Sequence, residues 1–135
     1  MKSILLALLI VPLISSLKVD PEKIEWWESV IKPHVEKCKV ETKVDPNFVD
    51  RMKFLEFPDE PNFRCFVKCL YTGIGVIDSE GRVNVEKVAE KLTFNSLEKA
   101  ESCKRKAEAK RDSCERPYRL LLCIVRAASD KPESD

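Results

Sequence analysis

Six cysteines in a chain of 135 residues are the feature that most limits how this sequence folds. An even number of cysteines indicates a disulfide framework in an oxidising compartment, and metal binding or redox chemistry in a reducing one. The compartment therefore has to be inferred from the rest of the sequence. The gaps between successive cysteines are 26, 3, 33, 10 and 8 residues, and the cysteines are Cys38, Cys65, Cys69, Cys103, Cys114 and Cys123.

The first sixteen residues have the pattern of a secretory signal peptide. Lys2 precedes an apolar run over residues 4–14, and Ser15 and Ser16 follow as small residues for cleavage. A helix of this run would be about 16 Å long, half of a ~30 Å hydrocarbon core, so the run is too short to span a membrane. We expect a signal peptide over residues 1–16 and a secreted, extracellular protein with one domain over residues 17–135.

The charge balance gives no reason to expect nucleic acid as a partner. The chain has 24 Lys and Arg against 23 Asp and Glu, and removal of Lys2 with the signal peptide makes it neutral. The only basic stretch, residues 104–111, is interleaved with Glu101, Glu108 and Asp112, which is typical of a solvated helix face. No stretch after the signal peptide is apolar enough for a membrane span.

Helical periods run through most of the mature chain, and strand signals are weak. Capping residues and prolines mark six helices, the first with a kink expected at Pro33. A turn over residues 76–82 should have Gly81 at positive φ. The expected helices begin at Asp20–Pro21; at Asp45–Pro46, ending at Pro58; at Pro61, ending near Gly73; at Asn84, ending near Leu92; at Asn95 or Ser96, passing Cys103; and at Asp112 or Ser113. The sequence predicts a compact all-α domain.

In an oxidising compartment three disulfides are the expected use of the six cysteines. Cys65 and Cys69 stand four residues apart on one helix, so their Cβ atoms face the same way and they are poorly placed to bond each other. Zinc binding is disfavoured because the spacing lacks a C-x-x-C pair. Six cysteines allow fifteen connectivities, and the spacing alone does not choose among them.

The cysteine pattern resembles that of insect odorant-binding proteins of the pheromone- and general-odorant-binding superfamily. The resemblance rests on the signal peptide, on Cys65-Phe-Val-Lys-Cys69 with the stretch 75–82 after it, and on the eight residues between Cys114 and Cys123. It implies three interlocked disulfides, Cys38–Cys69, Cys65–Cys114 and Cys103–Cys123, around an apolar cavity. It also implies that the protein carries small hydrophobic molecules, such as odorants or pheromone-like compounds.

Apolar residues on every expected helix are candidates for the wall of that cavity. Offsets from the cysteines align four of them, Ile31, Met52, Tyr71 and Ile124, with pocket positions of the family. Tyr71 and Tyr118 could also offer a hydroxyl to a ligand oxygen. The candidate ligand-binding residues are Ile31, Met52, Phe66, Leu70, Tyr71, Ile74, Val88, Leu92, Leu97, Tyr118, Leu121 and Ile124.

No residue pattern indicates catalysis. His34 is the only histidine and has no evident Ser, Cys or metal-ligand partner, and oxidised cysteines leave no thiol nucleophile. We expect no enzyme activity, no cofactor and no metal. Homodimer formation and a membrane receptor are left open as partners. The alternative to a carrier is a secreted helical effector or signalling protein with a packed core and no ligand.

The C-terminal residues 129–135 should not regulate binding by filling the cavity. They contain Pro132 and three acids, so they have little apolar surface to offset the entropy of ordering. We predict that deleting them changes ligand affinity by less than about threefold at pH 7 and at pH 5. Ligand titration of the full and shortened chains checks this, and a tail-dependent loss of binding at pH 5 would contradict it.

Overall fold

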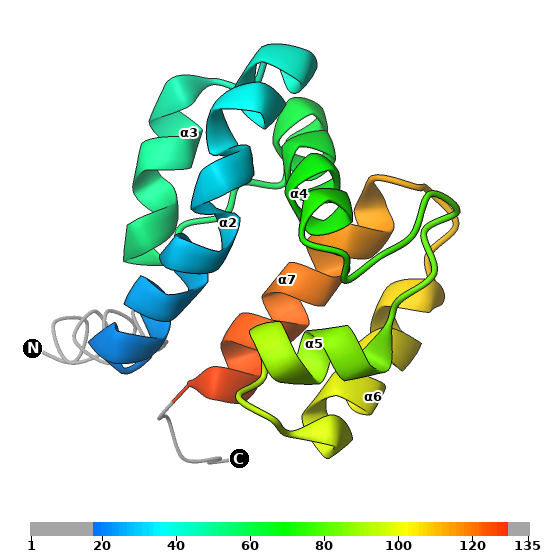
Figure 1. Cartoon of the computed structure of the whole chain (residues 1–135). Helices are drawn as coiled ribbons and strands as arrows, with labels where there is room; N and C mark the ends of the chain where they lie inside the picture. Colours follow the sequence, from blue (N-terminus) through cyan, green and yellow to red (C-terminus); the bar gives the residue numbers. More distant parts are fainter. Residues whose placement is uncertain (1–17, 130–135) are drawn as a thin grey trace, which may run out of the picture.

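A computed structural model describes residues 18–129; the expected signal peptide and residues 130–135 lie outside this range. The described chain is all-α, with one isolated β-bridge between Ile77 and Val83 around a turn in which Gly81 has φ 81°. Its helices are α2 (Pro21–Thr42), α3 (Pro46–Arg51), the 3₁₀ helix η2 (Met52–Phe54), α4 (Pro61–Gly73), α5 (Val85–Lys91), α6 (Leu97–Glu108) and α7 (Glu115–Ala128) (Figure 1). Within residues 18–129 no helix has the length and apolar character to cross a bilayer.

Side-chain caps start four helices at the places that the sequence indicates, whereas the last helix, expected to start at Asp112 or Ser113, begins as α7 at Glu115. The carboxylates of Asp20 and Asp45 accept hydrogen bonds from backbone N–H groups two residues on, and Asn84 does the same for the N–H of Lys87. Ser96, not Asn95, caps α6, because Asn95 lies in the left-handed region at φ 68°. Asp112 accepts from the N–H groups of Cys114 and Glu115, and these bonds lower the pKa of its carboxyl.

The second helix ends earlier than the sequence predicts. The expected end was Pro58, but α3 gives way to the 3₁₀ turn η2, and the chain leaves the helix at Leu55, which has φ 62°. A left-handed residue ends a helix because it directs the next backbone groups away from the axis. The turn is spanned by a hydrogen-bonded ion pair of 2.7 Å between Arg51 and Glu56.

The disulfides are those that the resemblance implies, Cys38–Cys69, Cys65–Cys114 and Cys103–Cys123, and no cysteine is free. The two cysteines of α4 therefore bond to different neighbours, one to α2 and the other to the residue that precedes α7. The third disulfide joins α6 to α7. Since no cysteine lies between residues 39 and 64 or between 70 and 102, α3, η2 and α5 have no cross-link.

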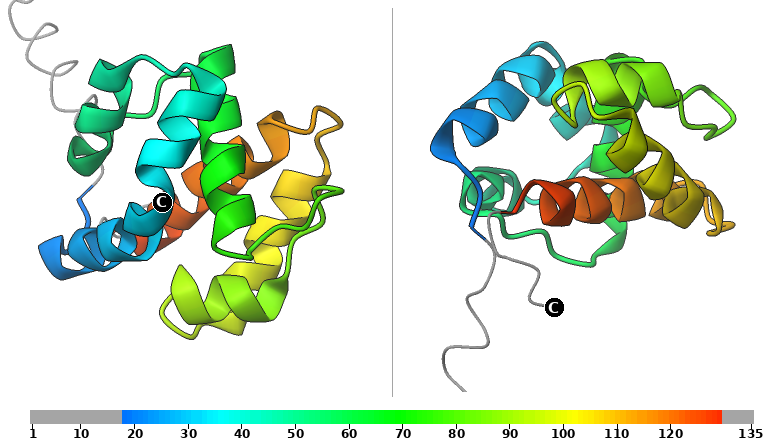
Figure 2. Two further views of the ribbon diagram at one scale, coloured as in Figure 1. Left: turned by 45° about the horizontal axis from the view of Figure 1, so that its top comes forward. Right: turned by 90° about the horizontal axis from the view of Figure 1, so that it is seen from below.

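The helices pack in a series, α2 on α4, α4 on α7, α7 on α6 and α6 on α5 (Figures 1 and 2). The buried faces of α4 and α7 supply the centre of the core, including Phe63, Phe66, Leu120 and Val125. Helix α2 continues through Pro33, and its axis changes direction along its length (Figure 2). Helix α4 therefore packs against both α2 and α7.

A close approach between α2 and α4 depends on Gly73. A Cβ atom added at this residue would lie 2.6 Å from Nδ1 and 2.9 Å from Cγ of His34. His34 is half-buried in α2, so its ring would have to move. The only histidine thus packs against the end of α4.

We predict that Gly73→Ala lowers the free energy of unfolding by about 1–2 kcal/mol, because overpacking against His34 outweighs the gain in helix propensity. In a His34→Ala background the clash is absent, and the same change should raise stability by up to about 1 kcal/mol. Urea denaturation of the four proteins measures both effects. The same sign in both backgrounds would contradict the contact.

Candidate functional site

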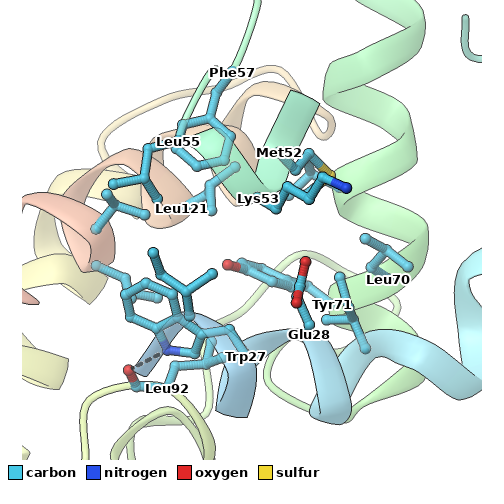
Figure 3. A pocket seen from close by; sticks show the side chains of 15 residues that line it. Trp27, Glu28, Met52, Lys53, Leu55, Phe57, Leu70, Tyr71, Leu92 and Leu121 are labelled. Carbon is cyan, nitrogen blue, oxygen red and sulfur yellow. Dashed lines mark hydrogen bonds between the residues drawn. The ribbon is translucent and has the colours of Figure 1, made fainter. Parts of the chain in front are cut away.

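A cavity lies where α2, η2, α4 and α7 meet the end of α5 (Figure 3). The volume open to the centre of a water molecule is about 60 Å³. Apart from Glu28 and Lys53, the wall is apolar or aromatic. The lining residues are Ile24, Trp27, Glu28, Ile31, Met52, Lys53, Leu55, Phe57, Val67, Leu70, Tyr71, Leu92, Leu121, Ile124 and Val125.

Two adjacent indoles join the α2 wall to the end of α5. The N–H of Trp26 donates to the carbonyl of Lys91 at 2.8 Å, and that of Trp27 donates to the carbonyl of Leu92 at 3.0 Å. The last carbonyls of a helix have no partner within it, so these bonds satisfy groups that α5 leaves free. Trp27 is half-buried and lines the cavity on the same face of α2 as Ile24 and Ile31, while Trp26 is 46% exposed.

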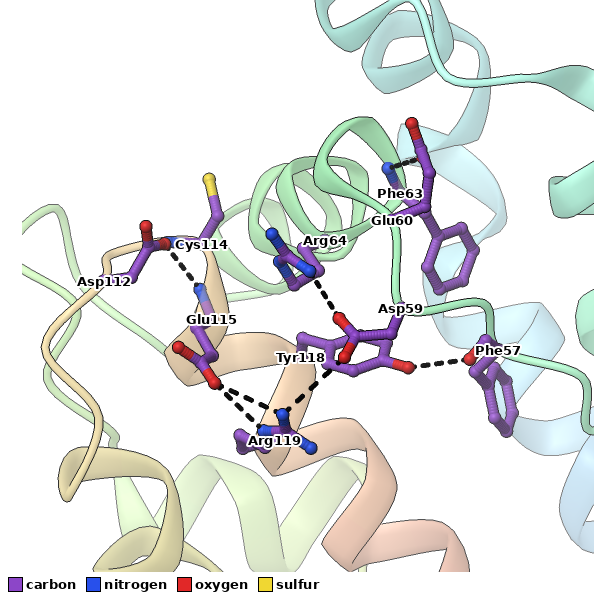
Figure 4. Close-up of polar contacts among 10 residues, drawn as sticks. All are labelled: Phe57, Asp59, Glu60, Phe63, Arg64, Asp112, Cys114, Glu115, Tyr118 and Arg119. Carbon is purple, nitrogen blue, oxygen red and sulfur yellow. Dashed lines mark hydrogen bonds and ion pairs between the residues drawn. The ribbon is translucent and has the colours of Figure 1, made fainter.

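The opposite wall is held by a cluster of polar contacts (Figure 4). The Tyr118 hydroxyl donates to the carbonyl of Phe57 at 2.7 Å. Asp59 forms an ion pair with Arg64 of α4 and a second one, of 3.8 Å, with Arg119 of α7. The segment after η2 is thereby tied to α4 and α7, and this places Leu55 and Phe57 at the cavity.

Charged groups lie only at the mouth. Glu28 and Lys53 come from opposite sides of the cavity, and both are exposed (Figure 3). The ammonium of Lys53 stands 5.5 Å from the ring centre of Phe54. Residues 18–129 hold no cluster of three or more His, Cys, Asp or Glu side chains able to bind a metal ion.

Of the twelve candidate ligand-binding residues, the structure brings seven together around this cavity: Ile31, Met52, Leu70, Tyr71, Leu92, Leu121 and Ile124. Phe66, Ile74 and Val88 are buried in the surrounding core, and the Tyr118 hydroxyl is already bonded to Phe57. Leu97 is 51% exposed, because it is the first residue of α6 and precedes the buried face that begins at Ala100. Ligand binding by any of the twelve stays a prediction.

Four of the eight lining residues absent from that prediction follow a helical period in the sequence. Ile24 and Trp27 precede Ile31 on one face of α2, Val67 lies one turn before Leu70 and Tyr71, and Val125 follows Leu121 by four residues. No helical period in the sequence indicated Leu55 or Phe57 as lining residues. Their positions depend on the left-handed backbone of Leu55, which ends the helical period.

The sequence also matches a known protein family over most of its length. Residues 27–127 match the model of the PBP/GOBP family. The chain belongs to this family. It is 26% identical over 98 residues to general odorant-binding protein 99a of Drosophila melanogaster, an alignment covering 67% of this chain and 69% of the relative. It is also 22% identical over 111 residues to general odorant-binding protein 99b of the same species, covering 71% and 74%.

Solved structures of insect proteins share the fold. The odorant-binding protein dmelOBP28a from Drosophila melanogaster superposes with a TM-score of 0.59 at 19% identity, covering 74% of this chain and 90% of that one. The fatty acid binding protein OBP56a from the oral disk of the blowfly Phormia regina gives a TM-score of 0.58 at 24% identity, with the same coverage. Both the all-α fold and the resemblance expected from the sequence are confirmed.

Proposed function

We propose that this protein is a secreted carrier that binds small hydrophobic molecules in the cavity bounded by α2, η2, α4 and α7. The apolar wall of this cavity is the observation that supports the proposal most strongly. Burial there would stabilise an apolar ligand by about 25 cal/mol per Å². The expected signal peptide and the three disulfides support secretion, since disulfides persist in oxidising compartments.

Binding requires the cavity to widen. A water molecule occupies about 30 Å³ of liquid, and a cavity of about 150 Å³ is known to hold benzene. The present 60 Å³ is smaller than either a mid-sized odorant or benzene needs. The wall best suited to move is the segment 52–57, because it carries no disulfide and Met52, Leu55 and Phe57 are only half-buried.

The structural relatives are consistent with this chemistry. The blowfly relative is described as a fatty acid binding protein, a ligand class with a long apolar part. In our proposal the apolar part of a ligand lies among Ile31, Leu70, Leu121 and Ile124, and Lys53 and Glu28 border its exit. Odorants or pheromone-like compounds are the ligands that the family suggests.

A secreted effector with a packed core is the second candidate, and the small volume of the cavity is the observation in its favour. The two functions differ in what co-purifies with the protein. A carrier should retain apolar molecules detectable by mass spectrometry after native purification. It should also bind an apolar fluorescent probe that added ligands displace, whereas a packed core should do neither.

We predict that wild-type protein binds such a probe with a dissociation constant near micromolar, about −8 kcal/mol. Met52→Arg should weaken binding more than tenfold, because it places a charge in the apolar wall. The matched control is Val40→Arg, on a side chain of α2 that is 77% exposed and lies outside the cavity. Probe titration with a thermal melt of each variant checks this; equal effects of the two substitutions would place the binding site elsewhere.

Tryptophan fluorescence should report occupancy through one indole. Trp27 lines the cavity and Trp26 does not, so a ligand should alter the emission of Trp27. We predict that Trp26→Phe keeps the ligand-dependent change and that Trp27→Phe loses most of it. A change that persists in Trp27→Phe and vanishes in Trp26→Phe would argue for binding outside this cavity.

A further inference from the structure

The hydroxyl of Tyr71 is a polar group that the fold leaves without a partner. Tyr71 is 4% exposed and lies on α4, and burial raises the pKa of its phenol. No residue in the range 18–129 hydrogen-bonds this hydroxyl, yet no polar side-chain atom there is both sealed from solvent and unbonded. The oxygen must therefore reach open space, and Figure 3 shows it directed into the cavity.

The other polar groups around the cavity are either bonded or outside its apolar part. The indole N–H of Trp27 is bonded to Leu92, and the Tyr118 hydroxyl is bonded to Phe57. Glu28 and Lys53 are exposed at the mouth. Among the described residues that line the cavity, Tyr71 is thus the one with a buried donor to spare.

A ligand that carries an acceptor can bond this hydroxyl when it enters the cavity, whereas a hydrocarbon in the same place would leave the hydroxyl buried without a partner, which is unfavourable. The acceptor should be neutral, because a carboxylate beside Tyr71 would be an uncompensated buried charge. Lys53 is the basic residue among those that line the cavity, and it lies at the mouth, where it is exposed.

We propose that Tyr71 makes the cavity selective for neutral ligands with an oxygen acceptor, such as ketones, aldehydes and esters, over hydrocarbons and carboxylates. This selectivity rests on the proposed carrier function and adds the ligand class to it. The Tyr71 O–H donates to the ligand oxygen, while the apolar chain of the ligand packs on Ile31, Leu121 and Ile124.

The test compares two ligands that differ at one group. Methyl heptyl ketone carries C=O, and its methylene isostere has C=CH₂ in the same place; nonanoic acid is the charged comparison. Tyr71→Phe removes only the hydroxyl oxygen. It should weaken binding of the ketone by about three- to tenfold and leave binding of the isostere within about twofold. Wild type should bind the ketone better than the nonanoate ion.

The control variant is Tyr118→Phe. It removes a hydroxyl that is bonded to the carbonyl of Phe57, so any loosening of that wall affects both ligands alike, and the ratio of ketone to isostere affinity should be unchanged. Infrared spectra give a second readout, since the carbonyl stretch of the bound ketone should lie lower in wild type than in Tyr71→Phe. An unchanged ratio and stretch in Tyr71→Phe would overturn the role of Tyr71 and leave the carrier function intact. Failure of wild type to bind either neutral ligand would overturn both proposals.

Discussion

Three disulfides join four helices into one continuous frame, and the rest of the structure depends on this constraint. Cys38–Cys69 links α2 to α4, Cys65–Cys114 links α4 to the start of α7, and Cys103–Cys123 links α7 to α6. Each cross-link restricts the unfolded chain and contributes roughly 2–4 kcal/mol. A small domain stabilised in this way can leave part of its interior unfilled, and the cavity lies against three helices of the frame, α2, α4 and α7.

The two segments outside the frame are held by hydrogen bonds from aromatic side chains and, after η2, also by the ion pairs of Asp59. The end of α5 receives hydrogen bonds from the indoles of Trp26 and Trp27, and the chain after η2 receives one from Tyr118. Each bond is worth about 1 kcal/mol, less than a disulfide, so these walls are easier to displace than α4 or α7. The cavity therefore has walls of two kinds: α2, α4 and α7 are fixed by disulfides, whereas the end of α5 and the segment after η2 have no cross-link.

The sequence could predict whatever depends on short-range chemistry. Asp20, Asp45 and Asn84 were found as caps because their side chains bond backbone groups two or three residues away. The resemblance supplied the disulfide pairing, which spacing alone left open. The left-handed backbone of Leu55 was not predictable, because packing and the Arg51–Glu56 pair stabilise it against the preference of leucine. The sequence accordingly pointed to seven of the residues that line the cavity, Met52 and Leu92 among them, and contained no signal for Leu55 or Phe57.

Four aromatic side chains at or near the cavity carry a hydrogen-bond donor, and three of them use it to bond the backbone. Trp26, Trp27 and Tyr118 each donate to a backbone carbonyl in a segment that lacks a cross-link. Tyr71 has the same kind of donor, but no residue in the range 18–129 accepts a hydrogen bond from it, and its helix α4 is already fixed by two disulfides. A hydroxyl buried there is not needed to anchor the chain and has no carbonyl to bond. Because a packed core would favour phenylalanine at such a position, the oxygen of Tyr71 fits the proposed role in ligand binding better than a role in the stability of the fold.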